Sequence, residues 1–84
     1  MFSAYWQGHF PAFQHGISKE DILHALNTKI YDASIGEFPE KYGVIGFNRD
    51  WKPLEIIFNP IDDNSINVFH AMKLRKSFIK MLGL

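Results

Sequence analysis

Apolar and polar positions in this chain follow two periods, a helical one near both ends and a strand-like one in between. In the segment from 18 to 28, the apolar residues fall on one side of a helix. Ser18 stands before them as an N-cap, and Asp21, three residues later, lies in the first turn. The pattern predicts a helix that ends near Asn27. Its apolar face consists of Ile22, Ala25 and Leu26.

A shorter helix is predicted before this one. Pro11 suits the first turn of a helix, and Gly16 suits a left-handed C-terminal stop. Two helices are therefore expected near the N-terminus.

The middle of the chain consists of short apolar runs separated by polar, proline-containing turns. Each run has the length of a strand, and the loops at 48–53 and 60–65 are short enough to join antiparallel neighbours. The pattern predicts a sheet of three or four antiparallel strands. The predicted strands are 29–35, 41–48, 53–59 and 65–72.

Helical spacing returns at the end of the chain. Phe78 and Leu82 are four residues apart, and three lysines recur on the other face of the same predicted helix. These lysines are Lys73, Lys76 and Lys80. The sequence thus predicts one domain over residues 1–84, of the α+β class, with two N-terminal helices, an antiparallel sheet and a basic C-terminal helix.

The composition favours a folded protein without disulfide bonds. Of the 84 residues, 46% are hydrophobic and 15% are aromatic, which argues against disorder. The absence of cysteine excludes disulfides and thiolate sites, and it favours a reducing compartment. The opening residues show neither region of a signal peptide, and no apolar run reaches the roughly 20 residues that span a bilayer. We therefore expect a cytoplasmic protein.

The formal net charge of zero conceals an uneven distribution of charge. Residues 1–72 hold five cations and nine anions, whereas residues 73–84 hold four cations and no anion. A basic end of this kind serves either as an anion-facing patch or simply as the solvated face of a helix. Charge alone does not decide between these two interpretations.

Several familiar kinds of active site have no support in this sequence. The four histidines are scattered, without helical i, i+4 spacing and without a nearby set of carboxylates, so neither a metal site nor a cofactor is expected. His24 follows Glu20 by one helical turn, as in a surface pair. A glycine-rich phosphate loop and a G-x-S-x-G nucleophile elbow are both missing.

One group of polar residues remains as a candidate active site. Glu55 interrupts an apolar strand and His70 interrupts the next, so pairing of these strands brings both side chains toward the basic segment. The basic residues there are Lys73, Arg75 and Lys76. Such a group suits phosphodiester transfer, in which a 2′-hydroxyl loses a proton, the phosphorane needs positive charge and the leaving 5′-oxygen gains a proton. A single histidine at a strand end is also a common structural residue, so both interpretations stand.

A second group of cations lies in the polar loop before the third predicted strand. Arg49 and Lys52 stand beside Trp51, an arrangement that suits contact with RNA. For Trp51 itself, we favour the alternative interpretation, an apolar lid on the sheet.

Four local motifs occur in a recognisable order. "QHGIS" (residues 14–18) opens into a helix, Lys41 precedes the strand "YGVIG", and "LEIIF" forms the next apolar strand. The closing "INVFHAMKL" (residues 66–74) is similar to Ile-Arg-Ile-Ile-Ser-Ala-Arg-Lys-Ala. Over roughly residues 12–80, this order resembles that of the BrnT-like toxins of bacterial type II toxin–antitoxin pairs, which are small relatives of the RelE/ParE fold.

The resemblance implies a sheet flanked by helices, an endoribonuclease that inhibits translation by cutting mRNA, and a cognate antitoxin protein that masks the active face. The chain departs from the family pattern at four positions. Asn67 and Met72 stand where the family has arginines, His70 stands where it has serine, and Gln14 replaces a lysine. A weakly active or inactive relative is therefore the alternative.

The leading hypothesis is a metal-independent ribonuclease toxin that forms a hetero-oligomer with its antitoxin. In this hypothesis His70 is the acid or base, Glu55 is its partner, and Arg75 with Lys73 and Lys76 forms the phosphate clamp. Further RNA contacts are expected from Lys80, Arg49 and Lys52. The alternative is a non-catalytic module on the same fold, which binds protein or nucleic acid without cutting it.

Overall fold

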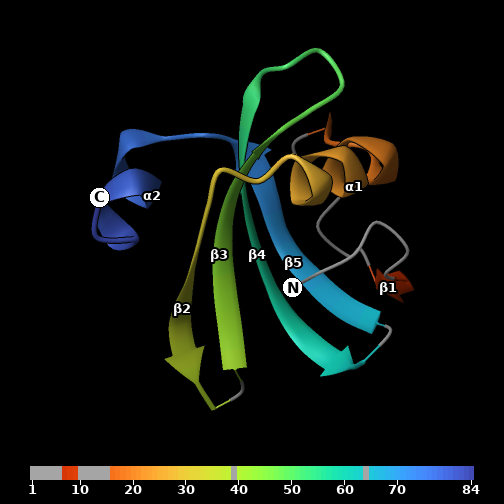
Figure 1. Cartoon of the computed structure of the whole chain (residues 1–84), viewed down its shortest axis with the longest axis vertical. Helices are drawn as coiled ribbons and strands as arrows, with labels where there is room; N and C mark the ends of the chain where they lie inside the picture. Colours follow the sequence, from red (N-terminus) through yellow and green to blue (C-terminus); the bar gives the residue numbers. More distant parts are fainter. Residues whose placement is uncertain (1–6, 10–15, 39, 64) are drawn as a thin grey trace.

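A computed structural model describes residues 7–9, 16–38, 40–63 and 65–84 of the chain. Its centre is a five-stranded sheet in the order β1-β5-β4-β3-β2, with one helix on each side (Figure 1). Strands β2 to β5 are antiparallel neighbours joined by hairpins, and β1 pairs with β5 in parallel. The strands are β1 (Gln7–His9), β2 (Tyr31–Glu37), β3 (Glu40–Phe47), β4 (Pro53–Asp62) and β5 (Ser65–Lys73), and the helices are α1 (Lys19–Asn27) and α2 (Lys76–Met81).

The predicted α+β class is confirmed, and the antiparallel part of the sheet has four strands, within the predicted three or four. Strand β1, a three-residue strand that extends the sheet beside β5, was not predicted. Within the described part of the chain, neither helix is long and apolar enough to cross a membrane.

Helix α1 forms as predicted. The Ser18 side chain accepts a hydrogen bond from the Asp21 backbone N–H at 3.2 Å, which satisfies one of the free donors of the first turn. The three apolar residues of the predicted face are buried. Gly16 has a φ of 72°, the left-handed conformation expected of a helix stop, but the helix predicted before it lies outside the described residues.

The two helices approach the sheet closely on opposite faces, at two glycines of β3. A Cβ atom on Gly46 would lie 1.9 Å from the Ala25 carbonyl oxygen in α1. A Cβ atom on Gly43 would lie 2.7 Å from Leu82 and 3.3 Å from Phe78, beside α2. Since neighbouring residues of a strand point to opposite faces, a spacing of three places the two glycines under different helices. The "YGVIG" stretch thus has a packing function.

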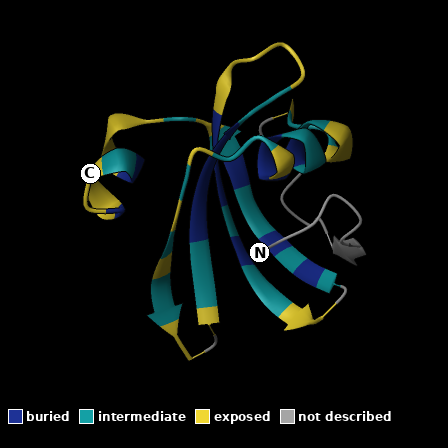
Figure 2. Ribbon diagram, in the orientation of Figure 1, coloured by how far each residue is buried: buried dark blue, intermediate teal, exposed yellow. Residues whose placement is uncertain are grey.

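Each face of the sheet carries its own apolar cluster. The cluster under α1 is the larger one, and it draws on β3, β4 and β5. The cluster under α2 joins Phe78 and Leu82 to Ile45, with Ile57 partly buried against them. Figure 2 shows that buried positions lie in the strands and inner helix faces, while the hairpin ends and much of the β3–β4 loop are exposed.

The C-terminal segment differs from the prediction. Lys73 is the last residue of β5, where it pairs with Leu54, and the Leu74 N–H bonds the Pro53 carbonyl at 3.2 Å. These bonds continue the sheet past the point where helical spacing was predicted to begin. Helix α2 therefore starts only at Lys76, and the expectation that Lys73 shares a helix face with the other two lysines is wrong.

Candidate active site

Glu55 and His70 lie on the face of the sheet that α2 covers, which we call the α2 face. Glu55 pairs with Met72 across β4 and β5, and His70 pairs with Ile57, one position further along the same face. The His70 Nε2 atom lies 2.7 Å from Glu55 Oε2. The predicted approach of these two side chains is confirmed.

Arg75 holds the same carboxylate from the other side. Its backbone N–H donates to Glu55 Oε1 at 2.8 Å, and its guanidinium donates through Nε to Oε1 at 3.1 Å and through Nη2 to Oε2 at 2.7 Å. The backbone of Arg75 is extended at the N-cap of α2, and this conformation directs both the N–H and the side chain toward β4. The Glu55 carboxylate is fully buried, whereas the Arg75 side chain is 51% exposed.

These contacts keep Glu55 ionised. Burial alone raises the pKa of this carboxyl group, but the hydrogen bonds from Arg75 and His70 and the charge of Arg75 outweigh it, and the net pKa lies below its ordinary value. The same hydrogen bond and charge raise the pKa of Arg75.

The ionised carboxylate sets the tautomer of His70. A carboxylate only accepts hydrogen bonds, so the proton of the 2.7 Å contact lies on His70 Nε2. In the neutral imidazole, Nδ1 is then the basic nitrogen, and among the described residues it has no hydrogen-bond partner. The ring lies nearly parallel to that of Phe78, with 6.4 Å between centroids, and the side chain is 22% exposed. The arrangement holds one histidine in a fixed orientation with one nitrogen available for proton transfer.

The basic residues of the C-terminal segment do not all gather around His70. Lys73 follows Met72 in β5 and pairs with Leu54, so it lies on the opposite face of the sheet from His70. Lys76 adjoins Arg75 at the start of α2, and Lys80 follows one helical turn later; both are exposed. The segment therefore offers Arg75 at the site and two lysines on the outer side of α2.

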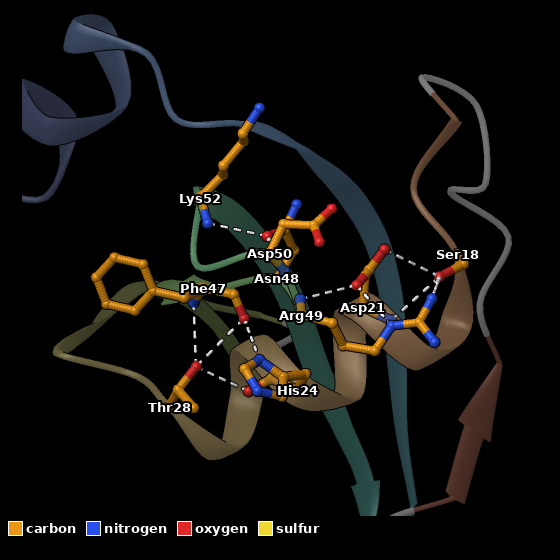
Figure 3. A network of polar contacts seen from close by, with 9 residues as sticks. All are labelled: Ser18, Asp21, His24, Thr28, Phe47, Asn48, Arg49, Asp50 and Lys52. Atoms are coloured by element: carbon orange, nitrogen blue, oxygen red, sulfur yellow. Dashed lines mark hydrogen bonds and ion pairs between the residues drawn. The ribbon is translucent and has the colours of Figure 1, made fainter.

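Arg49 and Lys52 belong to a separate network around α1 (Figure 3). Arg49 donates to Asp21 Oδ1 through its backbone N–H and through Nε, both at 2.9 Å. These hydrogen bonds lower the pKa of Asp21. The Lys52 backbone N–H donates to Asn48 Oδ1 at 2.9 Å, while its side chain extends away from the network. This network fixes the β3–β4 loop to α1, so Arg49 has a structural partner there.

The contacts of His24 and the exposure of Trp51 also differ from the predictions. The His24 Nδ1 lies 2.7 Å from the Phe47 carbonyl oxygen, so His24 ties α1 to β3 in place of the expected surface pair with Glu20. Trp51, at a φ of 61°, lies edge-on to the His24 ring with 5.0 Å between centroids. It is still 64% exposed, so it covers this histidine without forming a closed lid on the sheet.

Sequence reasoning missed a polar row on the α2 face. Asn59 and Asn67 are cross-strand partners in β4 and β5, and the Asn67 side-chain amide donates to Asn59 Oδ1 at 3.2 Å. Lys41 of β3 lies with its Nζ 5.8 Å from the centre of the Phe69 ring. The two asparagines face each other because the register shifts between the Asp62–Ser65 and Pro60–Ile66 pairs, and the sequence alone located neither this shift nor the bulge at Phe69.

In the described part of the chain, no three His, Asp or Glu side chains converge as the ligands of an ion would.

Comparisons with protein-family models, curated proteins and solved structures found no match to this chain. The resemblance to BrnT-like toxins therefore remains a prediction from its motifs.

Proposed function

We propose that this protein is a metal-independent endoribonuclease and the toxin of a type II toxin–antitoxin pair. The observation that carries the proposal is the contact between His70 Nε2 and the buried, ionised Glu55, a carboxylate that the Arg75 guanidinium also holds. This contact fixes the imidazole ring and leaves Nδ1 as its basic nitrogen. The order of the sequence motifs, which resembles that of BrnT-like toxins, supports the assignment as a toxin.

In the proposed reaction His70 Nδ1 takes the proton of a ribose 2′-hydroxyl, and the 2′-oxygen attacks the adjacent phosphorus. The bond from phosphorus to the 5′-oxygen breaks, and the imidazolium formed in the first step returns its proton to that oxygen. The products are a 2′,3′-cyclic phosphate and a 5′-hydroxyl. Glu55 stabilises the imidazolium while it exists, as a carboxylate does behind a catalytic histidine.

Arg75 contributes in two ways in this proposal. Through Nε and Nη2 it positions Glu55, and its remaining nitrogen, Nη1, is the donor available to a phosphate oxygen. Lys76 and Lys80 extend the positive charge along α2 toward the rest of the RNA. Lys73, on the other face, has no part in the phosphate clamp.

The same basic helix is the proposed docking site for the antitoxin. An acidic segment laid along Lys76 and Lys80 would associate quickly through complementary charge, and it would exclude RNA at the same time. Inhibition of translation is the expected consequence when the antitoxin is absent.

A non-catalytic protein- or nucleic-acid-binding module is the second candidate, and one observation favours it. Both oxygens of Glu55 are engaged, and one of their donors is the Arg75 backbone N–H, so the ion pair anchors the C-terminal segment to β4. A structural role of this kind accounts for the ion pair without any catalytic activity.

The ends of RNA products separate the two candidates. Purified protein is incubated with single-stranded RNA in excess EDTA, and the fragments are treated with phosphatase before and after acid opening of cyclic phosphates. The proposal predicts fragments with 2′,3′-cyclic phosphate and 5′-hydroxyl ends. Intact RNA at protein concentrations that bind it would favour the binding module.

A further inference from the structure

The α2 face has rows of side chains that run across the strands. Ile45, Glu55 and Met72 form one row, and Gly43, Ile57 and His70 form the next. Each row lies about 7 Å from its neighbour, because residues on one face of a strand are two positions apart. In Figure 1, α2 stands level with the upper parts of the strands, and the strands extend below it.

The next row is the polar one and lies below α2. It contains Asn59 and its partner Asn67, and it continues to Lys41, one position beyond the Tyr42–Phe58 pair of β3 and β4. The row is thus adjacent to the row of His70, on the same face of the sheet.

A bulge places an aromatic ring between these two rows. His70 pairs with Ile57 and Val68 pairs with Phe58, so Phe69 is an extra residue in β5. The contact with Lys41 Nζ locates the Phe69 ring on the α2 face. The ring is half-buried and has a lysine above it, which is the environment of a stacking surface with a cation at hand.

The two asparagines have hydrogen-bonding capacity to spare. Their mutual bond uses one amide N–H and one carbonyl, and each side chain also has a second polar atom. Whichever way the two amides are turned, one donor group and one acceptor remain for a ligand. A nucleobase edge carries the same pair of groups, as in the recognition of adenine by asparagine.

We infer that this row binds a single unpaired RNA base next to the scissile phosphate and sets the base preference of the enzyme. The base stacks on Phe69, its edge pairs with Asn59 and Asn67, and Lys41 leaves the ring face to hold the phosphate of that nucleotide. This inference rests on the proposed ribonuclease activity for the position of the cut, but base binding itself does not require cleavage.

The test uses binding without cleavage. Fluorescent RNA hexamers with 2′-O-methyl riboses, which lack the attacking hydroxyl, are titrated with the full chain and followed by anisotropy. The set is a uridine hexamer and its single A, C and G replacements. Phe69→Leu should weaken binding about 5- to 100-fold, the range for loss of one stacked base. Phe38→Leu is the matched control, because Phe38 is 95% exposed in the β2–β3 hairpin.

Two further variants test the proposed contacts with the edge of the base and with the phosphate of the bound nucleotide. Asn59→Asp replaces an amide by a carboxylate and should change the ranking of the four hexamers. Lys41→Met should reduce, by about one unit, the steepness with which the logarithm of the binding constant falls with the logarithm of the salt concentration. Lys19→Met on α1 is the control and should leave the Phe69-dependent binding in place. Melting temperatures confirm that each variant is folded.

The outcomes distinguish this inference from the proposed function. If Phe69→Leu and Asn59→Asp bind every hexamer as the wild type does, the base site is wrong, even where unmodified RNA is cut in a His70-dependent way. If Phe69-dependent binding is found but unmodified RNA is never cut, the base site stands and the ribonuclease proposal fails. Absence of any RNA binding contradicts both.

Discussion

The Arg75 guanidinium and backbone N–H together hold the buried carboxylate of Glu55, although the two residues are 20 positions apart. This clamp joins β4 to the start of α2 and leaves His70 as the third member of the group. Glu55 thereby contributes to the stability of the fold and, in the proposed reaction, to the orientation of His70.

Glu55→Gln should destabilise the fold. The amide keeps the shape of the side chain but loses the charge-assisted bonds, so the free energy of unfolding should fall by about 1–3 kcal/mol. Urea denaturation followed by tryptophan fluorescence measures the change. Glu37→Gln, at an exposed end of β2, is the control and should have little effect. Equal stabilities for the two variants would show that the clamp does not hold the segment.

The stability of the wild type should fall in acid, and Glu55 should account for part of the fall. Its folded-state pKa lies below the ordinary value of 4.5, so the unfolded chain takes up the proton first. The contribution of Glu55 is therefore complete above that value and is lost as pH decreases through 4.5 toward the folded-state pKa. Urea titrations from pH 7 to pH 2.5 should show a shallower decline for Glu55→Gln than for the wild type. Parallel curves would contradict this assignment.

Gly46→Ala should be among the most destabilising single substitutions in β3. The added methyl group would overlap the Ala25 carbonyl of α1, so the helix must move off the sheet, with a loss of about 1–3 kcal/mol or more. Gly36→Ala is the matched control, since its Cβ would have only the flexible Lys41 side chain nearby, at 3.6 Å. A melting temperature for Gly46→Ala at or above that of the control would mean that α1 does not pack there.

Local signals accounted for much of the fold. Ser18 and the apolar residues after it were sufficient to predict α1, because a cap and a helical period are short-range features. Glu55 and His70 were predicted to meet because each interrupts an apolar strand and a short turn joins the two strands.

Other features depended on long-range pairing. Strand β1 forms through contact with β5 more than fifty residues later, and its short sequence has no strand pattern of its own. Lys73 was assigned to a helix because its spacing to Lys76 fits one, but pairing with Leu54 keeps it in the sheet. The role of Arg75 as the clamp on Glu55 needs an extended residue before α2, which no spacing rule indicates.

The toxin proposal predicts that expression of the chain alone arrests bacterial growth. It also predicts that co-expression of the adjacent gene, the proposed antitoxin gene, restores growth. The proposal further predicts that amide exchange over residues 76–80 slows in the complex, since the antitoxin covers the basic face of α2. Normal growth at confirmed folded expression would favour the non-catalytic module.

The most direct test of the central claim is the His70→Gln variant, with cleavage and melting temperature measured on the same sample. Glutamine keeps a hydrogen-bond donor for Glu55 but cannot act as a base at the position of Nδ1. We predict a loss of RNA cleavage of about 10²-fold or more, the usual scale for a general acid–base group, with a melting transition close to that of the wild type. A folded His70→Gln protein that cuts RNA at the wild-type rate would contradict the account.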